Sequence, residues 1–111
     1  MSERVLEVDD DATLRRALAQ RLAHWGLGVV EAADGDAALA ALRREHVDLV
    51  LLDISLPGRS GLDVLRAMRE DDLAADVVVL TAHGSVDTAV QALKLGAADV
   101  LQKPADFDLL R

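Results

Sequence analysis

The sequence predicts an α/β fold in which five parallel strands alternate with helices, (βα)5, and the helices are doubly wound over both faces of one sheet. Short apolar runs alternate along the chain with segments whose apolar residues recur every three or four positions. The longer runs are continuous, as in strands that are buried on both faces, and do not alternate between apolar and polar residues. Strands separated by helices pair in parallel through right-handed crossovers, which leaves few topologies.

The first strand is predicted at residues 5–8, and Asp11 is the expected cap of the first helix. The strand is apolar except for Glu7. The helix presents one apolar face, formed by Leu14, Leu18, Leu22 and Trp25. Gly26 is placed to end this helix, because glycine readily adopts the left-handed conformation that follows many helix C-termini.

The second and third units repeat this pattern. Residues 29–30 form a short strand, and Asp34 is placed to cap a helix whose apolar side carries Ala38, Leu39 and Leu42. Residues 49–52 form the third strand. The third helix is predicted by Ser60 and Asp63, which have the spacing of a capping box and precede Leu62, Leu65 and Met68.

The last two units are predicted at residues 77–80 for the fourth strand and 100–101 for the fifth. Between them lies a helix with Ser85 as its cap and Gly96 as its stop. We expect this helix to pack on the sheet through Val86, Ala89, Val90 and Leu93. A fifth helix, truncated at the end of the sequence, is indicated by Phe107, Leu109 and Leu110. We therefore expect residues 1–111 to be one domain from the N-terminal part of a longer protein.

Composition excludes several classes of function. The formal charge of −8 disfavours direct contact with nucleic acid, because phosphates would be repelled. The chain has no cysteine, which excludes disulfides, thiol catalysis and cysteine-based metal centres. No apolar run approaches the roughly 20 residues of a membrane span, and the N-terminus lacks the apolar core of a signal peptide. We therefore expect a cytoplasmic protein that does not contact the membrane.

Polar side chains follow four of the five predicted strands. In open parallel sheets, ligands bind beyond the carboxyl ends of the strands. The residues delivered there are, in chain order, Asp9 to Asp11, Asp53, Thr81 and Lys103. The second strand ends in Glu31, which is expected to offer little to a site.

This set of side chains suits phosphoryl transfer. Carboxylates placed together repel one another unless a cation lies among them, and Mg²⁺ prefers such oxygen ligands. Asp53 could then act as a carboxylate nucleophile for a phosphoryl group. Lys103 and Thr81 could hold the phosphoryl oxygens by charge and hydrogen bonding.

Four sequence blocks resemble the signature blocks of response-regulator receiver domains. They are VDDDATLR, LVLLDISLPGRSGLDVL, VVVLTAHGS and GAADVLQKP, and they cover nearly the whole chain in the family's order and spacing. Residues 81–104 most resemble receivers that control sigma-54-dependent activators. The resemblance implies a flavodoxin-like sheet of strand order 2-1-3-4-5, in which the first and third strands lie side by side.

The resemblance also implies a role for each residue of the site. Asp53 would be the phosphoacceptor, Thr81 the switch hydroxyl and Lys103 the ammonium that binds the phosphoryl group. The expected magnesium ligands are Asp10, Asp53 and the backbone carbonyl of Ser55, with Asp9 bound mainly through water. Ala82 and His83 lie near the expected phosphoryl group, where receivers tune the lifetime of the phosphorylated state.

Two positions depart from the family's pattern. Receivers often carry an aromatic residue where this chain has Val100, so a switch that moves a ring at that position is not available here. Glu7 occupies a position that is usually apolar. Because a buried carboxylate is costly in its charged form, we expect Glu7 to have either a raised pKa or a basic partner.

The resemblance implies a sensor histidine kinase as the phosphoryl donor. It also implies an output domain in the same chain, a switching face formed by the fourth helix, fifth strand and fifth helix, and a homodimer that forms on phosphorylation. The domain would catalyse only its own phosphorylation and dephosphorylation, so it is not expected to be a stand-alone enzyme.

Two alternatives are weighed against this function. A phosphatase with an aspartyl-phosphate intermediate usually has a second aspartate two residues after the nucleophile, where this chain has Ser55. A receiver-like binding module that is never phosphorylated would not need the acidic pair, the acceptor, the threonine and the lysine together. Absence of magnesium binding would favour this second alternative.

Overall fold

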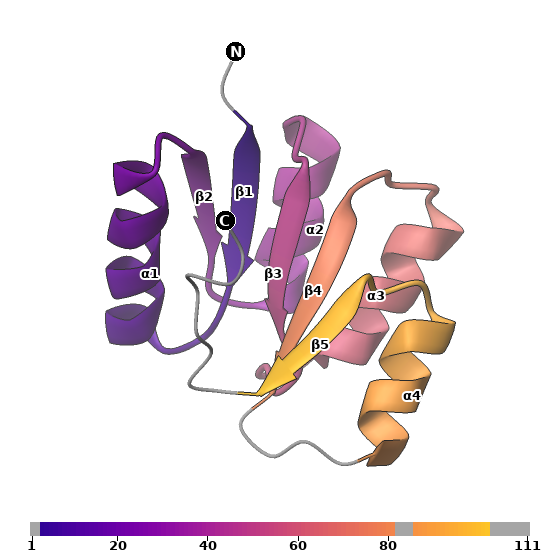
Figure 1. The fold of residues 1–111 in the computed structure, drawn as a ribbon. Helices are drawn as coiled ribbons and strands as arrows, with labels where there is room; N and C mark the ends of the chain where they lie inside the picture. Colours follow the sequence, from indigo (N-terminus) through magenta and orange to yellow (C-terminus); the bar gives the residue numbers. More distant parts are fainter. Residues whose placement is uncertain (1–2, 82–85, 103–111) are drawn as a thin grey trace.

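The computed structural model describes residues 3–81 and 86–102 (Figure 1). These residues form one parallel sheet of order β2-β1-β3-β4-β5. The strands are β1 (Arg4–Val8), β2 (Gly28–Ala32), β3 (Leu49–Asp53), β4 (Asp76–Thr81) and β5 (Asp99–Gln102). The predicted strand order and the parallel pairing are confirmed. The predicted fifth helix lies outside the described residues.

The described helices cover the sheet on both faces, which confirms the doubly wound arrangement. They are α1 (Ala12–His24), α2 (Gly35–Arg44), α3 (Gly61–Glu70) and α4 (Val86–Lys94). Leu18 and Leu22 of α1 pack with Val5, Leu51, Val78 and Leu80 on one face of the sheet. The buried residues of α2, α3 and α4 pack on the other face against Leu6, Val8, Val50, Leu52, Val77 and Val79. Alternate residues of each inner strand thus enter two separate cores.

Most of the predicted helix boundaries are confirmed. The side chain of Asp11 caps α1 by accepting from the N–H of Leu14, and Asp34 caps α2 by accepting from the N–H of Ala37. Ser60 and Asp63 form the predicted capping box of α3. Trp25 follows α1 and packs against the core that α1 covers. Ser85, the predicted cap of α4, lies outside the described residues.

Two glycines confirm the predicted ends of α1 and α4. Gly26 has a φ of +88° and Gly96 a φ of +97°, in the left-handed region that favours glycine. Arg69 of α3 donates hydrogen bonds to the carbonyls of Leu95 and Gly96, each at 2.8 Å. This side chain therefore ties the C-terminal end of α4 to α3.

The predicted buried face of α4 is wrong. Val86, Val90 and Leu93 are 78%, 41% and 51% exposed, and the buried residue of α4 is Ala92. Ala92 therefore lies on the side of α4 that faces the core, and the larger apolar side chains lie on the outside. We call Val86, Val90 and Leu93 the α4 stripe.

Glu7 is buried on the face of β1 that α1 covers. Its exposed fraction is 2%, and its neighbours across the sheet are Glu31 in β2 and Leu51 in β3. The predicted burial is therefore confirmed, while the raised pKa or basic partner stays a prediction. A titration that follows the Glu7 carboxyl carbon by NMR tests it, and an ordinary acidic pKa without a basic partner would contradict it.

Candidate functional site

The register of the sheet brings the predicted site residues to one edge. Val8 lies beside Leu52 at the carboxyl ends of β1 and β3, so Asp9 follows β1 next to Asp53, the last residue of β3. Asp53 in turn lies beside Leu80 of β4, and Thr81 is the next residue. The sequence predicts that the third and fourth strands end one residue before Asp53 and Thr81. In the structure, these two residues are instead the last residues of β3 and β4.

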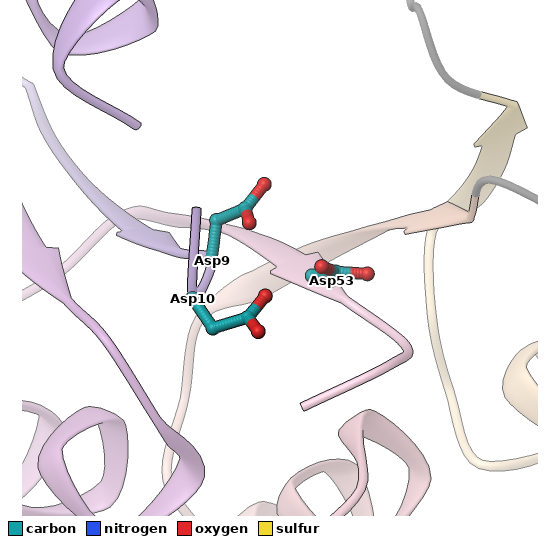
Figure 2. A group of neighbouring side chains, drawn as sticks. All are labelled: Asp9, Asp10 and Asp53. Atoms are coloured by element: carbon teal, nitrogen blue, oxygen red, sulfur yellow. The ribbon is translucent and has the colours of Figure 1, made fainter. Parts of the chain in front are cut away.

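Asp9, Asp10 and Asp53 form one acidic cluster (Figure 2). Carboxylate oxygens from the three side chains all lie within 4.8 Å of one another. Asp9 and Asp53 are each only 5% exposed, whereas Asp10 is exposed to solvent. The predicted acidic pair and the predicted acceptor are thus brought together, with the open side of the cluster at Asp10.

Backbone N–H groups hold two of these carboxylates in place. Oδ1 of Asp9 accepts a hydrogen bond of 2.9 Å from the N–H of Asp11. Oδ1 of Asp53 accepts one of 3.1 Å from the N–H of Ser55. Each bond spans two residues and forms a local turn of the kind that aspartate favours. The carboxylate directions are therefore partly fixed by the loops that follow β1 and β3.

The donor set fits a small divalent cation. Magnesium–oxygen distances of about 2.0–2.1 Å allow two ligand oxygens to lie up to about 4.2 Å apart. Three carboxylate oxygens within 4.8 Å can reach that spacing through small side-chain adjustments. Without a cation, three carboxylates at this separation repel one another.

The loop after β3 is held against the acceptor by a close backbone approach. Gly61, the first residue of α3, donates its N–H to the carbonyl of Ile54 at 3.0 Å. A Cβ atom on Gly61 would lie 2.5 Å from the carbonyl oxygen of Asp53 and 2.8 Å from the Cα of Ile54. Only glycine therefore fits between α3 and the end of β3.

The other predicted site residues fall into two groups. Thr81 is buried at 3% exposure at the end of β4, and Ser55 is exposed in the loop after β3. Lys103, Ala82 and His83 lie outside the described residues.

Val100, the position without an aromatic ring, lies in β5 beside Val79. It is partly buried and packs against the core formed with α2, α3 and α4. The β-branched side chain is therefore part of the sheet's packing at this position.

Two residues near the site make contacts that the sequence did not predict. Arg15 of α1 donates a hydrogen bond of 2.7 Å from Nη1 to the carbonyl of Asp9. Its Nε donates at 3.0 Å to Oε1 of Glu31 in β2. The expectation that the end of the second strand contributes little is therefore incomplete, because Glu31 contacts the residue that holds Asp9.

Within the described ranges 3–81 and 86–102, no helix has the length and apolar character needed to cross a membrane.

The fold and the acidic edge define a class of signalling domain, and comparison with known families identifies it. Residues 5–111 match the model of the response regulator receiver domain. The chain belongs to this family, whose members act in two-component signalling. The predicted membership is confirmed, as is the flavodoxin-like fold.

Individual relatives agree with this assignment. The chain is 42% identical over 107 residues to the transcriptional regulatory protein ZraR of Klebsiella oxytoca, which covers 96% of this chain and 24% of ZraR. The chain thus spans about a quarter of that relative. The predicted likeness to receivers of sigma-54-dependent activators is confirmed.

Solved structures show the same fold. The signal receiver domain of a LuxO repressor protein from Vibrio parahaemolyticus has a TM-score of 0.93 and 35% identity, covering 99% of this chain and 85% of that one. A response regulator from Burkholderia pseudomallei, solved with a phosphorylated aspartic acid, calcium ion and citrate, has a TM-score of 0.91 and 33% identity. That match covers 98% of this chain and 64% of the solved one.

Proposed function

We propose that this chain is the phosphoacceptor domain of a two-component response regulator and that Asp53 receives the phosphoryl group. The donor is the phosphohistidine of a sensor histidine kinase, and the transfer depends on Mg²⁺. The observation that carries the proposal is the acidic cluster, in which oxygens of Asp9, Asp10 and Asp53 lie within 4.8 Å of one another. The Burkholderia pseudomallei relative, which carries a phosphorylated aspartic acid and a calcium ion, supports it.

The transfer exchanges one bond to phosphorus for another. A carboxylate oxygen of Asp53 attacks the phosphorus atom and forms an O–P bond. The N–P bond to the histidine breaks, and the histidine nitrogen keeps the electron pair and takes up a proton. In dephosphorylation, water attacks the phosphorus atom and the O–P bond to Asp53 breaks. The Asp53 carboxylate keeps the electron pair, the water proton passes to solvent, and inorganic phosphate leaves. A bound magnesium ion supplies positive charge that offsets the charge on the phosphoryl oxygens.

The remaining residues hold the reactants. Asp10 would bind the cation directly, Asp9 would bind it mainly through water, and Ser55 would contribute its backbone carbonyl. Thr81 and Lys103 bind phosphoryl oxygens, and Lys103 adds the positive charge that stabilises the transition state. Ala82 and His83, which lie outside the described residues, tune the lifetime of the phosphoryl group.

Phosphorylation shifts the domain between two conformations. Val100 has no ring to move, so the shift acts through the backbone around Thr81 and the loop before α4. The readout face consists of α4, β5 and the expected fifth helix. The domain forms the N-terminal part of a longer cytoplasmic regulator, whose output domain, rather than this acidic domain, controls transcription.

Intact-mass spectrometry tests the proposed function directly. The chain is incubated with acetyl phosphate and Mg²⁺, and again with a chelator added. We expect one phosphoryl adduct with Mg²⁺ and none with the chelator. A folded chain that gains no adduct and binds no magnesium would instead be a receiver-like binding module. Steady turnover of small phosphomonoesters would indicate the phosphatase alternative.

The α4 stripe gives a second testable prediction, about the proposed homodimer. Its side chains are spaced four and three residues apart on one exposed side of α4, which suits contact with another apolar surface. We expect Leu93→Glu to weaken phosphorylation-dependent dimerisation at least tenfold, because a charged group would be buried in the contact. Sedimentation velocity in acetyl phosphate and Mg²⁺ measures this.

The matched control for this variant is Leu14→Glu. Leu14 is 38% exposed on α1, so the same change of side chain and charge is made away from α4. Both variants should gain the phosphoryl adduct as the wild type does. Equal dimerisation of Leu93→Glu and wild type would show that the α4 stripe is not the contact, and a phosphorylated wild type that stays monomeric would refute the dimer itself.

A further inference from the structure

Arg15 connects three parts of the molecule at the acidic edge. It lies in the first turns of α1, and its guanidinium donates to the carbonyl of Asp9 at 2.7 Å and to Oε1 of Glu31 at 3.0 Å. Because helical side chains lean toward the helix N-terminus, an arginine at this position reaches back over the loop that precedes α1. The side chain of Arg15 is only 14% exposed, so this arrangement is partly shielded from water.

The carbonyl that Arg15 holds belongs to the peptide bond between Asp9 and Asp10. A peptide group is planar, so fixing its oxygen fixes the orientation of the whole plane. That plane sets ψ of Asp9 and φ of Asp10, which direct the two side chains. On its other side, Asp9 is held by its N–H, which donates to the carbonyl of Ala32 at 3.1 Å. The peptide between the two carboxylates is thus fixed by α1 and β2 together.

Glu31 determines where the guanidinium lies. It accepts from Nε, whereas Nη1 donates to Asp9, so the two contacts use different donors of one rigid planar group. A lysine, with one ammonium on a flexible stem, lacks this fork of fixed donors.

We propose that Arg15 is a positioning residue for the cation site and that Glu31 braces it. This inference rests on the proposed function, because it assigns these residues to the same magnesium site. Neither side chain binds the cation. They act by holding the Asp9–Asp10 peptide in the orientation that points both carboxylates toward Asp53.

Removal of the Arg15 side chain should change the magnesium affinity in the direction opposite to that expected from charge alone. A guanidinium close to the cluster repels a divalent cation, so by Coulomb's law alone its removal would tighten magnesium binding. If positioning dominates, removal loosens the peptide and weakens binding. Outer-shell partners of metal ligands typically change metal affinity by about 10-fold to 100-fold.

The test compares Arg15→Ala with Arg16→Ala. Arg16 is the next residue of α1, is exposed, and makes no hydrogen bond or ion pair with any residue that the structure describes, so its loss changes the net charge equally. Calorimetric titration of the 111-residue chain with MgCl₂ gives the dissociation constant. We expect it to rise about tenfold in Arg15→Ala, to stay near the wild-type value in Arg16→Ala, and to be intermediate in Arg15→Lys.

The Mg²⁺ dependence of phosphorylation by acetyl phosphate distinguishes a misplaced cation site from a general loss of structure. In Arg15→Ala the Mg²⁺ concentration for half-maximal rate should rise about tenfold, while the rate at saturating Mg²⁺ falls much less. Glu31→Gln, which keeps an acceptor for Nε, should behave more like wild type than Glu31→Ala. Thermal unfolding in chelator shows whether each variant is folded.

Each outcome decides between the two proposals. Unchanged or tighter magnesium binding in a folded Arg15→Ala overturns the positioning role and leaves the proposed function intact. An equal loss of affinity in Arg16→Ala also overturns it, because the loss would then not depend on the hydrogen bonds that Arg15 makes to Asp9 and Glu31. A wild-type chain that binds no magnesium overturns the proposed function and this inference with it.

Discussion

Asp53→Asn is expected to abolish phosphorylation. The amide has the shape of the carboxylate, and its oxygen can still accept the hydrogen bond that Ser55 donates to Oδ1 at 3.1 Å. It lacks the anionic oxygen that attacks phosphorus, and it removes one of three carboxylates from the cluster. Under conditions that convert the wild type to the singly phosphorylated form, the variant should show no adduct by intact-mass spectrometry.

The control for this prediction is Asp76→Asn. Asp76 is the exposed first residue of β4, at the opposite end of the sheet from Thr81, and the substitution makes the same chemical change. It should gain the adduct at the wild-type rate. An adduct of wild-type yield on Asp53→Asn would assign the nucleophile to another residue.

Asp53→Asn should also be no less stable than the wild type when no cation is present. One of three repelling charges is removed, so the free energy of unfolding in chelator should stay the same or rise slightly. A large loss of stability would mean that failure to gain the adduct reflects unfolding rather than chemistry.

Gly61→Ala is expected to have the largest effect of any single methyl addition at the site. The added Cβ would lie 2.5 Å from the Asp53 carbonyl oxygen and 2.8 Å from the Ile54 Cα, and both are backbone atoms that cannot rotate away. Either α3 or the end of β3 must move. Overpacking of this kind typically destabilises a protein by about 1–3 kcal/mol. Urea unfolding followed by circular dichroism measures the loss.

Gly61→Ala should also slow phosphorylation, because the displaced backbone includes Asp53 itself. Gly28→Ala is the matched control. A Cβ on Gly28 would meet its nearest atoms at 3.7 Å or more, which is ordinary van der Waals contact. That variant should retain the stability and phosphorylation rate of the wild type. If Gly61→Ala behaved in the same way, the close approach of α3 to the acceptor strand would not constrain the site.

The sequence predicted the sheet and the acidic cluster for a physical reason. Continuous apolar runs between helical segments allow few topologies, and parallel strands bring their carboxyl ends to one edge. Asp9 and Asp53 therefore had to meet once β1 and β3 were neighbours. The strand order itself came from the resemblance to receivers, since apolar patterning does not order the strands.

The orientation of α4 on the sheet could not be predicted from the apolar pattern of the sequence. Periodicity shows that Val86, Val90 and Leu93 share one side of a helix, but not which side faces the sheet. The buried residue of α4 is Ala92, and such a small residue gives little hydrophobic signal in the sequence.

The position of Arg15 in the sequence contains one indication of its role. A cation in the first turns of a helix is disfavoured by the helix dipole, so a functional partner for it could have been sought in the preceding loop. The bond from Arg15 to Asp9 was still not predictable, because it goes to a backbone carbonyl whose direction depends on the folded loop.

The position of Trp25 has a practical consequence for spectroscopy. It is the chain's only tryptophan, and the chain has no tyrosine. The 13 residues of α1, about 20 Å of helix, separate it from the acidic loop. Trp25 packs against the core beneath α1, so its fluorescence should change sharply when the domain unfolds. The same emission should stay almost constant when magnesium or a phosphoryl group binds at the far end, which makes it a folding reporter insensitive to signalling state.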